Sequence, residues 1–555
     1  MPTITFSKKD LENLTGLKLS IEQIQELAHF GKGDFEDYNK STDEVKIDFG
    51  DTNLPYLWSV EGFARLLKGI KGKQKGIPQI KINKGNYKIK VHPSVNKIRP
   101  YISGFIIKGN KIDDYLIKQL VQLQDKLSDN YGRRRQYISI GLYSYDKIKF
   151  PIHYKAVSPE STEFIPLGYK LKFNLKEILA EHPKGKEYGY ILKDQDKYPI
   201  LVDSNNEVLS FPPIINSNFT GKVEEGDENL LFEVTGTNYD HVMLATNIFA
   251  YAMHDRGFKI FSADIDYGNK KVTCPSLDIK SKTVEKSQIK KLFGIDFKDL
   301  ELKNSLSKAH YNIESIDKEK IKVSIPPYRD DILHQNDIIE DIGIMHDYNN
   351  IQELPLPTFT IGETSKLIEF TDKVRELVVG LGYQEVMSPM LTNLKSLYDL
   401  MNIKDFGTVE IEDYMSENYS VVRSWILPQL LELMSKNKHQ PFPQKIFEEG
   451  IINSRKGDKI HDFHRIALAT SHEKADYTSI RQALDLILNS FQIKYTIEET
   501  EHLSFIPGRV GRLIVNNKKV GYIGEIAPIV LQNWGLEMPV SAAELNLTEL
   551  FTSTN

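Results

Sequence analysis

A short stretch in which proline alternates with leucine, Leu354-Pro355-Leu356-Pro357, constrains the fold of this chain most. Proline has no backbone N–H to donate and fixes its own φ, so neither a helix nor an inner strand runs through two closely spaced prolines. Regular helix and strand patterns stand on both sides of the stretch. We therefore expect a linker here, with residues 358–555 folding as a unit of their own.

Several further units are expected before the linker. The chain has 555 residues, which at roughly 100–200 residues per domain predicts about three to five domains. Helical and strand-like patterns mix in residues 1–90 and again in 91–270, and a shorter pattern fills 271–350. The predicted fold class is therefore multidomain α+β, with a small domain at 271–350 and a last domain at 358–555.

The patterns are clear enough to predict individual elements. Ser7 and Ser20 stand where each would cap a short helix. Leucines recur every three to four residues between Asp113 and Leu127, which predicts a longer helix. Strands are expected at 198–202 and 230–234, with a turn at 203–207.

Composition places the chain among ordinary globular proteins. Hydrophobic residues make up 40%, charged residues 26%, and the formal net charge is -5. A weakly acidic total does not exclude RNA, because phosphate contacts need only a local basic patch. Basic stretches occur at Lys68–Lys90 and Lys108–Arg135, which ends in the run Arg133-Arg134-Arg135. The alternative is that these side chains only keep the surface soluble.

The remaining features point to a cytoplasmic protein. Cys274 is the one cysteine, so no disulfide forms within the chain, as expected in a reducing compartment. The N-terminus has no basic patch followed by an apolar run, so we expect no secretory signal. The most apolar stretch, His241–Met253, is too short to span a bilayer, and no membrane association is expected.

A group of carboxylates follows Pro326-Pro327 and suggests a metal site. On a helix, Asp337, Glu340 and Asp341 share one face, and Asp331 stands just before it. Like charges so placed repel, and a hard cation such as Mg²⁺ prefers oxygen ligands. The alternative is that these acids only complement the dipole at the helix N-terminus.

The last unit carries two segments similar to signatures of class II aminoacyl-tRNA synthetases. A helix, Gly382 and a strand ending at Pro389 resemble the first signature. The segment from Pro443 to Gly450 resembles the second, in which an arginine two residues before a glutamate grips the α-phosphate of ATP. Here Ile446 and Phe447 take the two possible arginine positions. Since phosphate charge must be neutralised for adenylate transfer, we expect an antiparallel-sheet domain that is class-II-like in shape and inert in that chemistry.

A second group of polar residues predicts a small-molecule pocket. Ser210, Asn216, Glu233 and Thr235 offer hydroxyl, amide and carboxylate groups, and Pro212-Pro213 stiffens the approach to Asn216. Such groups suit recognition of a phenolic hydroxyl, because a site built around an OH strongly rejects the analogue that lacks it. The alternative is a polar loop that proline makes rigid.

Taken together, these segments resemble the archaeal and eukaryotic-cytosolic branch of phenylalanyl-tRNA synthetase β subunits over nearly the whole chain. The matching motifs stand in the family's order. They are Asp51–Gly62, Asn130–Arg135, Phe211–Ser217 with Glu233–Thr237, Pro326–Asp331, and Phe505–Arg509 with Gly524–Ile526.

The resemblance implies an assembly of two α and two β chains that attaches Phe to its tRNA. The α subunit uses ATP to form the aminoacyl adenylate, and the β subunit hydrolyses mischarged Tyr-tRNA in an editing domain, here 91–270. The family's small domain is winged-helix-like and mainly architectural, so no DNA role is expected at 271–350. Mg²⁺ is shared with α at the β carboxylates, which here are Asp331, Asp337, Glu340 and Asp341.

The resemblance also assigns the editing pocket. Ser210, Asn216 and Glu233 match its catalytic positions, and Leu201 matches a substrate contact, with Thr235 beside them. The family more often has Asp where this chain has Glu233, so the carboxylate reaches one methylene further. Two other interpretations stay open: a free-standing aminoacyl-tRNA-binding protein without a ligase role, and an architectural subunit whose editing pocket has decayed.

Overall fold

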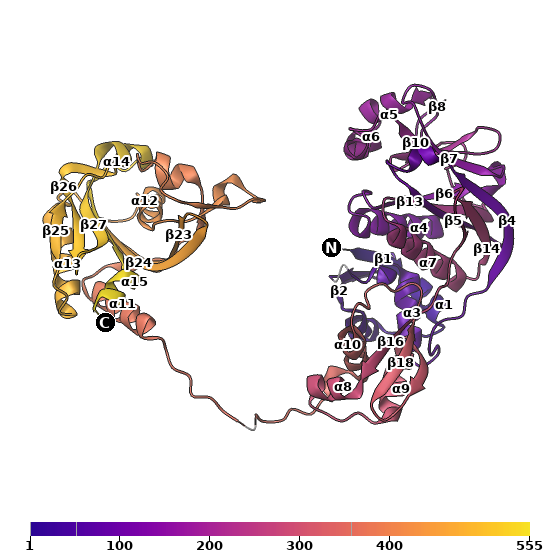
Figure 1. The fold of residues 1–555 in the computed structure, drawn as a ribbon, viewed down its shortest axis with the longest axis horizontal. Coiled ribbons are helices and arrows are strands. Elements are labelled where there is room, and N and C mark those ends of the chain that lie inside the picture. The colour runs from indigo at the N-terminus through magenta and orange to yellow at the C-terminus, as the bar shows by residue number, and fades with distance from the viewer. Residues whose placement is uncertain (1, 51–52, 357, 555) are drawn as a thin grey trace. The chain divides into compact units, whose positions relative to one another are not determined.

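The structure is a computed structural model that describes residues 2–50, 53–356 and 358–554. It divides into two compact units, Met1–Leu354 and Pro355–Asn555, and the division falls within the predicted linker (Figure 1). Asp51 and Thr52 of the first family motif and Pro357 of the linker lie outside the described residues. Among the helices that are described, none has the length and apolar character needed to cross a membrane.

The first unit begins with a small sheet covered by short helices. Its strand order is β1-β3-β2, and α1 and α3 pack against it. Ser7 caps α1 by accepting the amide of Asp10, and Ser20 forms a capping box with Gln23 at α2, as predicted. The elements are β1 (Thr3–Ser7), α1 (Lys8–Thr15), α2 (Ile21–Ala28), β2 (Gly33–Asn39), β3 (Glu44–Phe49) and α3 (Val60–Ile70).

A ten-stranded mixed sheet forms the centre of the first unit. The strand order is β12-β11-β10-β7-β4-β14-β5-β13-β6, with β15 paired to β14. The sheet therefore starts before residue 91 and ends after residue 270, the bounds expected for this domain. Its strands are β4 (Ile82–Val91), β5 (Tyr101–Lys108), β6 (Ile138–Ser144), β7 (Ile152–Val157), β10 (Tyr198–Val202), β11 (Val208–Phe211), β12 (Ile215–Asn216), β13 (Asn229–Gly236), β14 (Lys259–Asp266) and β15 (Lys271–Cys274).

The two faces of this sheet have different partners. The helices α4 (Asp114–Lys126) and α7 (Tyr239–Asp255) supply apolar side chains to one core cluster, together with Phe232 and Val234 of β13. Leu231 belongs to a separate core cluster with Tyr143, Tyr154 and Leu201. Because successive side chains of a strand alternate, Glu233 lies on the face of Leu231, opposite that of Phe232.

A small module completes the first unit. Its three antiparallel strands have the order β16-β18-β17, and α10 packs against α9 and β16. The predicted helix that carries Asp337, Glu340 and Asp341 is α10. The elements are β16 (Lys280–Glu285), α8 (Lys286–Phe293), α9 (Asp299–Lys308), β17 (Asn312–Ile316), β18 (Lys320–Ile325) and α10 (Gln335–His346).

The second unit is a seven-stranded sheet between two groups of helices. The order is β19-β23-β24-β28-β27-β26-β25, antiparallel except for the parallel pair of β19 and β23. α11, α13 and α15 cover one face, and α12 and α14 cover the other. The strands are β19 (Gln384–Glu385), β23 (Gln444–Lys456), β24 (Lys459–Ser471), β25 (Thr496–Glu499), β26 (Phe505–Val515), β27 (Lys518–Ile526) and β28 (Val540–Asn546). The helices are α11 (Lys366–Gly380), α12 (Leu427–Lys436), α13 (Tyr477–Ser490), α14 (Pro528–Trp534) and α15 (Leu547–Thr554).

Candidate functional site

A cavity of about 400 Å³ opens in the central sheet of the first unit, between α4, β6 and the β11–β12 hairpin. Its wall includes Ser210, Asn216 and Glu233, the three residues predicted to be catalytic. Leu201 and Thr235, predicted to contact substrate, are fully buried and lie behind the wall. Their side chains therefore support the wall and do not face a ligand.

Strand register explains why residues far apart in the sequence meet here. Ser210 of β11 stands opposite Leu201 on β10 and opposite Asn216 on β12. Residues directly opposite in antiparallel pairs point to the same face, so the three side chains form one row across β10, β11 and β12. Proline prevents further ladder pairing within Pro212-Pro213, where the chain turns between β11 and β12.

Glu233 is connected to Ser210 through a tyrosine that the sequence interpretation missed. The Tyr143 hydroxyl lies 2.6 Å from Glu233 Oε2 and 2.8 Å from Ser210 Oγ. Gly141 stands opposite Glu233 on β6, and a Cβ atom there would lie 2.5 Å from Glu233 Oε2 and 2.3 Å from the Tyr143 oxygen. Glycine at this position thus makes room for the longer carboxylate.

Burial governs the electrostatics of this group. Glu233 is only 2% exposed. Burial raises the pKa of its carboxyl to about 7, against smaller lowering effects from the Tyr143 hydroxyl, the Arg99 guanidinium and Thr235. Burial and the neighbouring carboxylate also raise the pKa of the Tyr143 phenol well above its ordinary value. Tyr143 is therefore neutral, while Glu233 exchanges its proton near neutral pH.

The hydroxyl chain has two proton arrangements, because a tyrosine O–H can donate only once. With Glu233 ionised, Tyr143 donates to it and Ser210 can donate to Tyr143, which leaves the Ser210 oxygen to accept from a ligand. With Glu233 protonated, both donations reverse, and the Ser210 O–H points to the cavity. The chain can therefore bind a ligand hydroxyl either as donor or as acceptor.

Asn216 supplies an amide at the same wall. Its Nδ2 donates to the carbonyl oxygen of Leu142 at 3.4 Å, a long hydrogen bond. A Cβ at Gly221 would lie 2.4 Å from the Asn216 Cβ, so glycine lets the neighbouring loop approach this residue closely. The half-buried amide keeps donor and acceptor capacity for a ligand.

The cavity adjoins a strained turn. Arg135 of this turn lines the cavity, together with Lys184, Lys222 and the acidic Asp125. Arg133, Arg134 and Arg135 are consecutive and have φ values of 47°, 51° and 65°. The left-handed region costs roughly 1–2 kcal/mol for each residue that carries a Cβ. Such strain persists only where the surroundings enforce it.

Hydrogen bonds from two sides hold this turn. The amides of Arg133, Arg134 and Arg135 donate at 2.8–3.1 Å to carbonyls at the end of the helical segment that precedes them. Beneath the turn, the buried Arg99 guanidinium donates to the carbonyls of Arg135 and Gln136 at 3.1 and 3.2 Å. The backbone conformation is thus fixed independently of any ligand.

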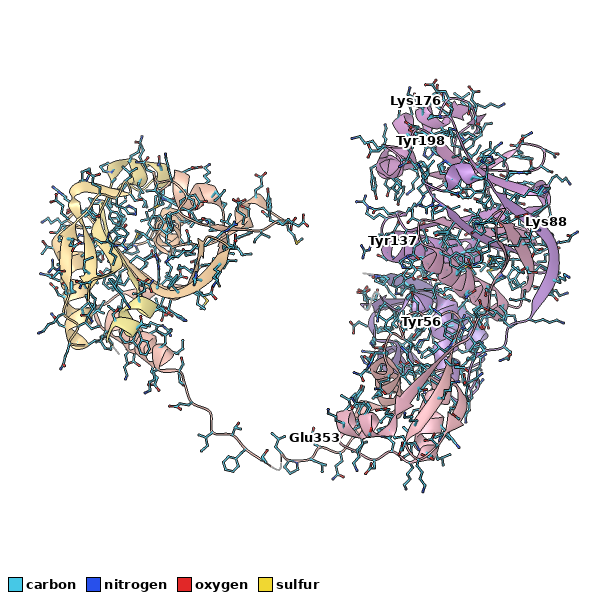
Figure 2. All side chains as sticks on the ribbon, in the orientation of Figure 1. Tyr56, Lys88, Tyr137, Lys176, Tyr198 and Glu353 are labelled. Carbon is cyan, nitrogen blue, oxygen red and sulfur yellow. The ribbon has the colours of Figure 1, made fainter. Side chains whose placement is uncertain are left out.

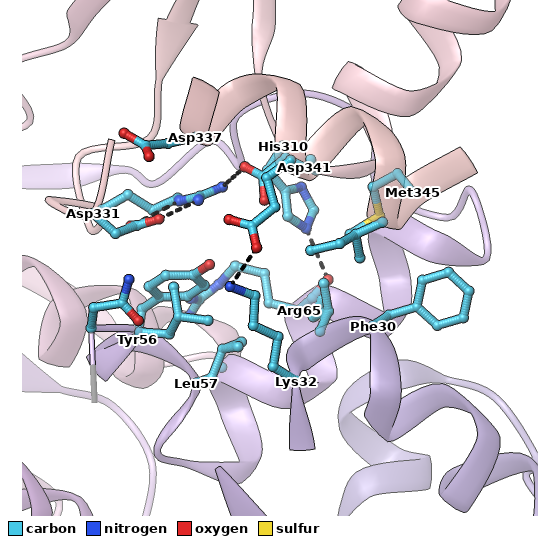
Figure 3. Close-up of a pocket in the computed structure, with 18 of the residues that line it drawn as sticks. Phe30, Lys32, Tyr56, Leu57, Arg65, His310, Asp331, Asp337, Asp341 and Met345 are labelled. Atoms are coloured by element: carbon cyan, nitrogen blue, oxygen red, sulfur yellow. Dashed lines mark hydrogen bonds and ion pairs between the residues drawn. The ribbon is translucent and has the colours of Figure 1, made fainter. Parts of the chain in front are cut away.

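The predicted metal ligands surround a second pocket, shown in Figure 3. Asp331 and Asp341 both form ion pairs with the buried Arg329, at 2.7 Å for Asp341, and Tyr311 donates to Asp341 at 2.5 Å. Glu340 pairs with Lys32 Nζ at 2.9 Å. The four predicted carboxylates are therefore neighbours, as expected.

These carboxylates do not fit a magnesium ion in the arrangement seen. Asp337 accepts the backbone amides of Leu333 and His334 at 2.7 and 2.6 Å and so caps α10. Arg329 neutralises Asp331 and Asp341, and Lys32 neutralises Glu340. Within residues 2–50, 53–356 and 358–554, no group of three acidic, histidine or cysteine side chains is placed so that it could hold a metal ion. The cluster acts here as an ion-pair network between the N-terminal domain and the small module.

Comparison with known proteins identifies the family. Residues 282–348 match the tRNA synthetase B5 domain, and 352–547 match the phenylalanyl-tRNA synthetase beta chain CLM domain. The phenylalanine–tRNA ligase beta subunit of Thermococcus onnurineus is 41% identical over 571 residues, which cover 99% of each chain. That of Pyrococcus horikoshii is 41% identical over 557 residues, 99% of this chain and all of the relative. The chain belongs to the phenylalanine–tRNA ligase β-subunit family.

A solved structure shows the same fold for the first unit. An N-terminal fragment of the phenylalanyl-tRNA synthetase β subunit from Pyrococcus horikoshii is 41% identical and superposes with a TM-score of 0.60. It matches 62% of this chain and 99% of the fragment. The chain is thus a multidomain α+β member of the β-subunit family that contains a B5 and a CLM domain.

In the CLM domain, a buried arginine and glutamate neutralise each other. Arg423 forms an ion pair with Glu448, and both side chains are almost fully buried. Arg423 also donates to Ser388 Oγ and Gln429 Oε1, each at 3.1 Å. Ile446 stands two residues before Glu448 on β23, where the class II signature has arginine. Arg423, which lies beside Glu448, is therefore committed to internal contacts.

The buried Glu233 predicts a pH dependence of stability. The folded chain holds the Glu233 proton up to about pH 7, whereas an unfolded glutamate loses it near 4.5. Its contribution to stability is therefore complete below about pH 4.5 and is lost as the pH rises through 7. Glu233→Gln should remove this loss, roughly 3 kcal/mol across the window. Urea denaturation at several pH values measures it.

The matched control for this pH series is Glu228→Gln, at an exposed position just before the same strand. Its profile should follow that of the unsubstituted chain. If both substitutions change the profile equally, the pH dependence does not come from Glu233.

The ion-pair network around Arg329 predicts a large stability effect. Arg329→Met should lower the free energy of unfolding by about 3–5 kcal/mol, because Asp331 and Asp341 stay buried without a counterion. Adding Asp331→Asn and Asp341→Asn should recover most of the loss. Arg375→Ala, which breaks half-exposed pairs, should cost at most about 1 kcal/mol. An Arg329 variant no less stable than the Arg375 variant would show that the network is not essential.

Proposed function

We propose that the chain functions as the β subunit in an assembly of two α and two β chains that attaches Phe to its tRNA. The α subunit binds ATP and Phe and carries the synthetic site. The main support is the full-length match to β subunits, together with the commitment of Arg423 to an internal ion pair with Glu448 in the CLM domain. A free-standing tRNA-binding protein would have no need for such a silent synthetase-like domain.

Exposed apolar side chains on the CLM domain support contact with α. Met387 is 96% exposed, and with Leu391 and Tyr419, also exposed, it lines a groove of about 360 Å³. Large exposed apolar patches on soluble proteins usually mark interaction sites. We assign this groove to the α-binding surface.

We further propose that the cavity in the central sheet hydrolyses mischarged Tyr-tRNA. Phe and Tyr differ by one hydroxyl, and an apolar synthetic pocket rejects an added hydroxyl weakly. A second pocket that recognises the hydroxyl corrects the error. The observation that carries this proposal is the buried chain of Ser210, Tyr143 and Glu233 at the wall of a cavity large enough for an amino acid.

The proposed reaction is attack by water on the ester. The water oxygen bonds to the ester carbonyl carbon, the bond from that carbon to the ribose 3′ oxygen breaks, and the water proton passes to the leaving ribose oxygen. Asn216 orients the ester carbonyl by hydrogen bonding, as amide donors do in acyl transfer. Ser210, Tyr143 and Glu233 hold the phenolic hydroxyl, so the tyrosyl ester is fixed for attack while the phenylalanyl ester is not.

Two family features stay predictions for the assembled complex. Magnesium binding at Asp331, Asp337, Glu340 and Asp341, shared with α, requires that the present partners of these carboxylates be exchanged, and no step of the proposed hydrolysis uses it. The winged-helix-like character of the small module agrees with its β-α-α-β-β order and the strand order β16-β18-β17. We assign this module an architectural role.

Substitutions in the cavity test the editing proposal. In the purified complex with α, Asn216→Ala should slow Tyr-tRNA hydrolysis by roughly 100-fold, the effect of losing one positioned donor. Glu233→Gln should slow it less and weaken discrimination against Phe-tRNA. Rapid-quench assays of labelled Tyr-tRNA measure both rates.

Asn205→Ala, in the exposed turn before β11, is the matched control and should hydrolyse at the normal rate. All variants should form Phe-tRNA normally, since α carries that site. Unchanged Tyr-tRNA hydrolysis in both cavity variants would place editing elsewhere.

A further inference from the structure

The turn Arg133-Arg134-Arg135 has a conformation that packing alone does not require of arginine. Three consecutive residues with a Cβ lie in the left-handed region that favours glycine. Backbone strain of this kind gathers at binding and catalytic sites, where it fixes side chains in place before the ligand arrives.

We propose that this turn, which we call the arginine turn, binds the sugar–phosphate backbone of the single-stranded 3′ end of a tRNA. The turn adjoins the cavity, because its last residue, Arg135, lines the cavity wall. The inference rests on the proposed editing function, because it names the part of the substrate that the turn holds. It adds a nucleic-acid site to the pocket that takes the amino acid.

The three side chains have different tasks. Arg135 is built into the cavity wall: its Nη1 donates to the carbonyls of Pro213 and Ile214 at 3.2 and 3.1 Å, and its guanidinium carbon lies 4.1 Å from the centre of the Tyr188 ring. Arg135 therefore connects the turn to the hairpin that carries Asn216. Its role is to set the distance between the phosphate site and the reacting ester.

Arg133 and Arg134 are exposed and available to phosphate. Neither forms an ion pair with a carboxylate within the described part of the chain. Each guanidinium instead lies over an aromatic ring, Arg133 at 5.0 Å from Tyr137 and Arg134 at 6.0 Å from Tyr190. Stacking on a ring leaves the N–H groups in the guanidinium plane free for a phosphate oxygen.

The surroundings of the turn suit single-stranded RNA. Tyr190 is 44% exposed and donates its hydroxyl to the Arg134 carbonyl at 3.2 Å, so its ring is held at the surface beside the charge. Tyr137, labelled in Figure 2, is half-buried and lies under the Arg133 guanidinium. Exposed aromatic rings interleaved with basic groups bind unpaired bases by stacking while the cations hold the backbone. Lys184 and Lys222 also line the cavity, each paired with a glutamate, Glu187 and Glu224.

Steady-state hydrolysis of Tyr-tRNA by the complex with α tests this site. Arg133→Ala/Arg134→Ala should raise KM at least 10-fold and change kcat by less than twofold, because the cavity is untouched. Single-stranded contacts contribute about 0.7 each to the slope of log affinity against log salt. The slope of log(kcat/KM) should therefore become shallower by about 1.4. Arg133→Lys/Arg134→Lys should restore most of the slope.

Two further variants keep the test decisive. Arg133→Gly/Arg134→Gly removes the same charges and relieves the backbone strain, so a loss of binding in it cannot come from misfolding. Lys88→Ala/Lys90→Ala, on exposed positions of β4 away from the cavity, removes two charges and should leave KM and the salt slope unchanged.

The outcomes separate this inference from the proposed function. If the unsubstituted complex does not hydrolyse Tyr-tRNA, the editing proposal fails, and fluorescence anisotropy with uncharged tRNA still shows whether the arginine variants lose affinity and salt slope. The assignment of this turn to RNA would be overturned if Arg133→Ala/Arg134→Ala left KM and the salt slope unchanged, or lowered kcat alone. It would also be overturned if this variant no longer bound α on size exclusion.

Discussion

The functional part of the first unit depends on one buried arginine. Arg99 is almost fully buried, and burial lowers its pKa to about 10. Its guanidinium donates to the hydroxyl and carbonyl of Thr235 at 3.0 and 2.8 Å and to Ser139 at 3.2 Å. The same group holds the carbonyls of Arg135 and Gln136. The Arg99 guanidinium therefore connects β13, β6 and the arginine turn. Its hydrogen bonds to these acceptors offset the free-energy cost of burying its charge.

This arrangement gives Thr235 and Glu233 different tasks on one face of β13. Thr235 binds Arg99 and fixes the sheet to the arginine turn. Glu233, two residues earlier, reaches the cavity through Tyr143. The Arg99 charge also favours the ionised form of Glu233 to a degree that does not outweigh burial. The carboxylate consequently stays near its midpoint at neutral pH, which lets the hydroxyl chain adapt to the ligand.

Much of this could be predicted from the sequence, because local signals decided it. Leucine spacing predicted α4, the serine caps predicted α1 and α2, and the prolines at 355 and 357 predicted the division into units. Residue types at Ser210, Asn216 and Glu233 suggested a polar pocket, and the family resemblance assigned the three residues to one site. The alternation of apolar residues along β13 could have predicted that Thr235 shares a face with Glu233. It could not have predicted the hydrogen bonds between Thr235 and Arg99.

What the sequence could not reveal are contacts between distant segments. Tyr143 lies 90 residues from Glu233 along the chain, and only the pairing of β6 with β13 brings them together. Arg329 and Lys32 neutralise carboxylates that were predicted to hold a metal. Lys32 lies just before β2 of the N-terminal sheet, about 300 residues from Glu340 along the chain. The left-handed φ values of the arginine turn oppose the intrinsic preference of arginine, so no propensity predicts them.

The most direct test of the central claim, that the cavity recognises a phenolic hydroxyl, is calorimetry with stable 3′-amide analogues of tyrosyl- and phenylalanyl-adenosine. The account predicts that the full chain binds the tyrosyl analogue at least about 10-fold more tightly, the discrimination expected from one satisfied buried hydroxyl. Glu233→Gln should narrow that difference. Equal affinity for the two analogues would contradict the account, because a cavity that ignores the hydroxyl cannot correct the error between Phe and Tyr.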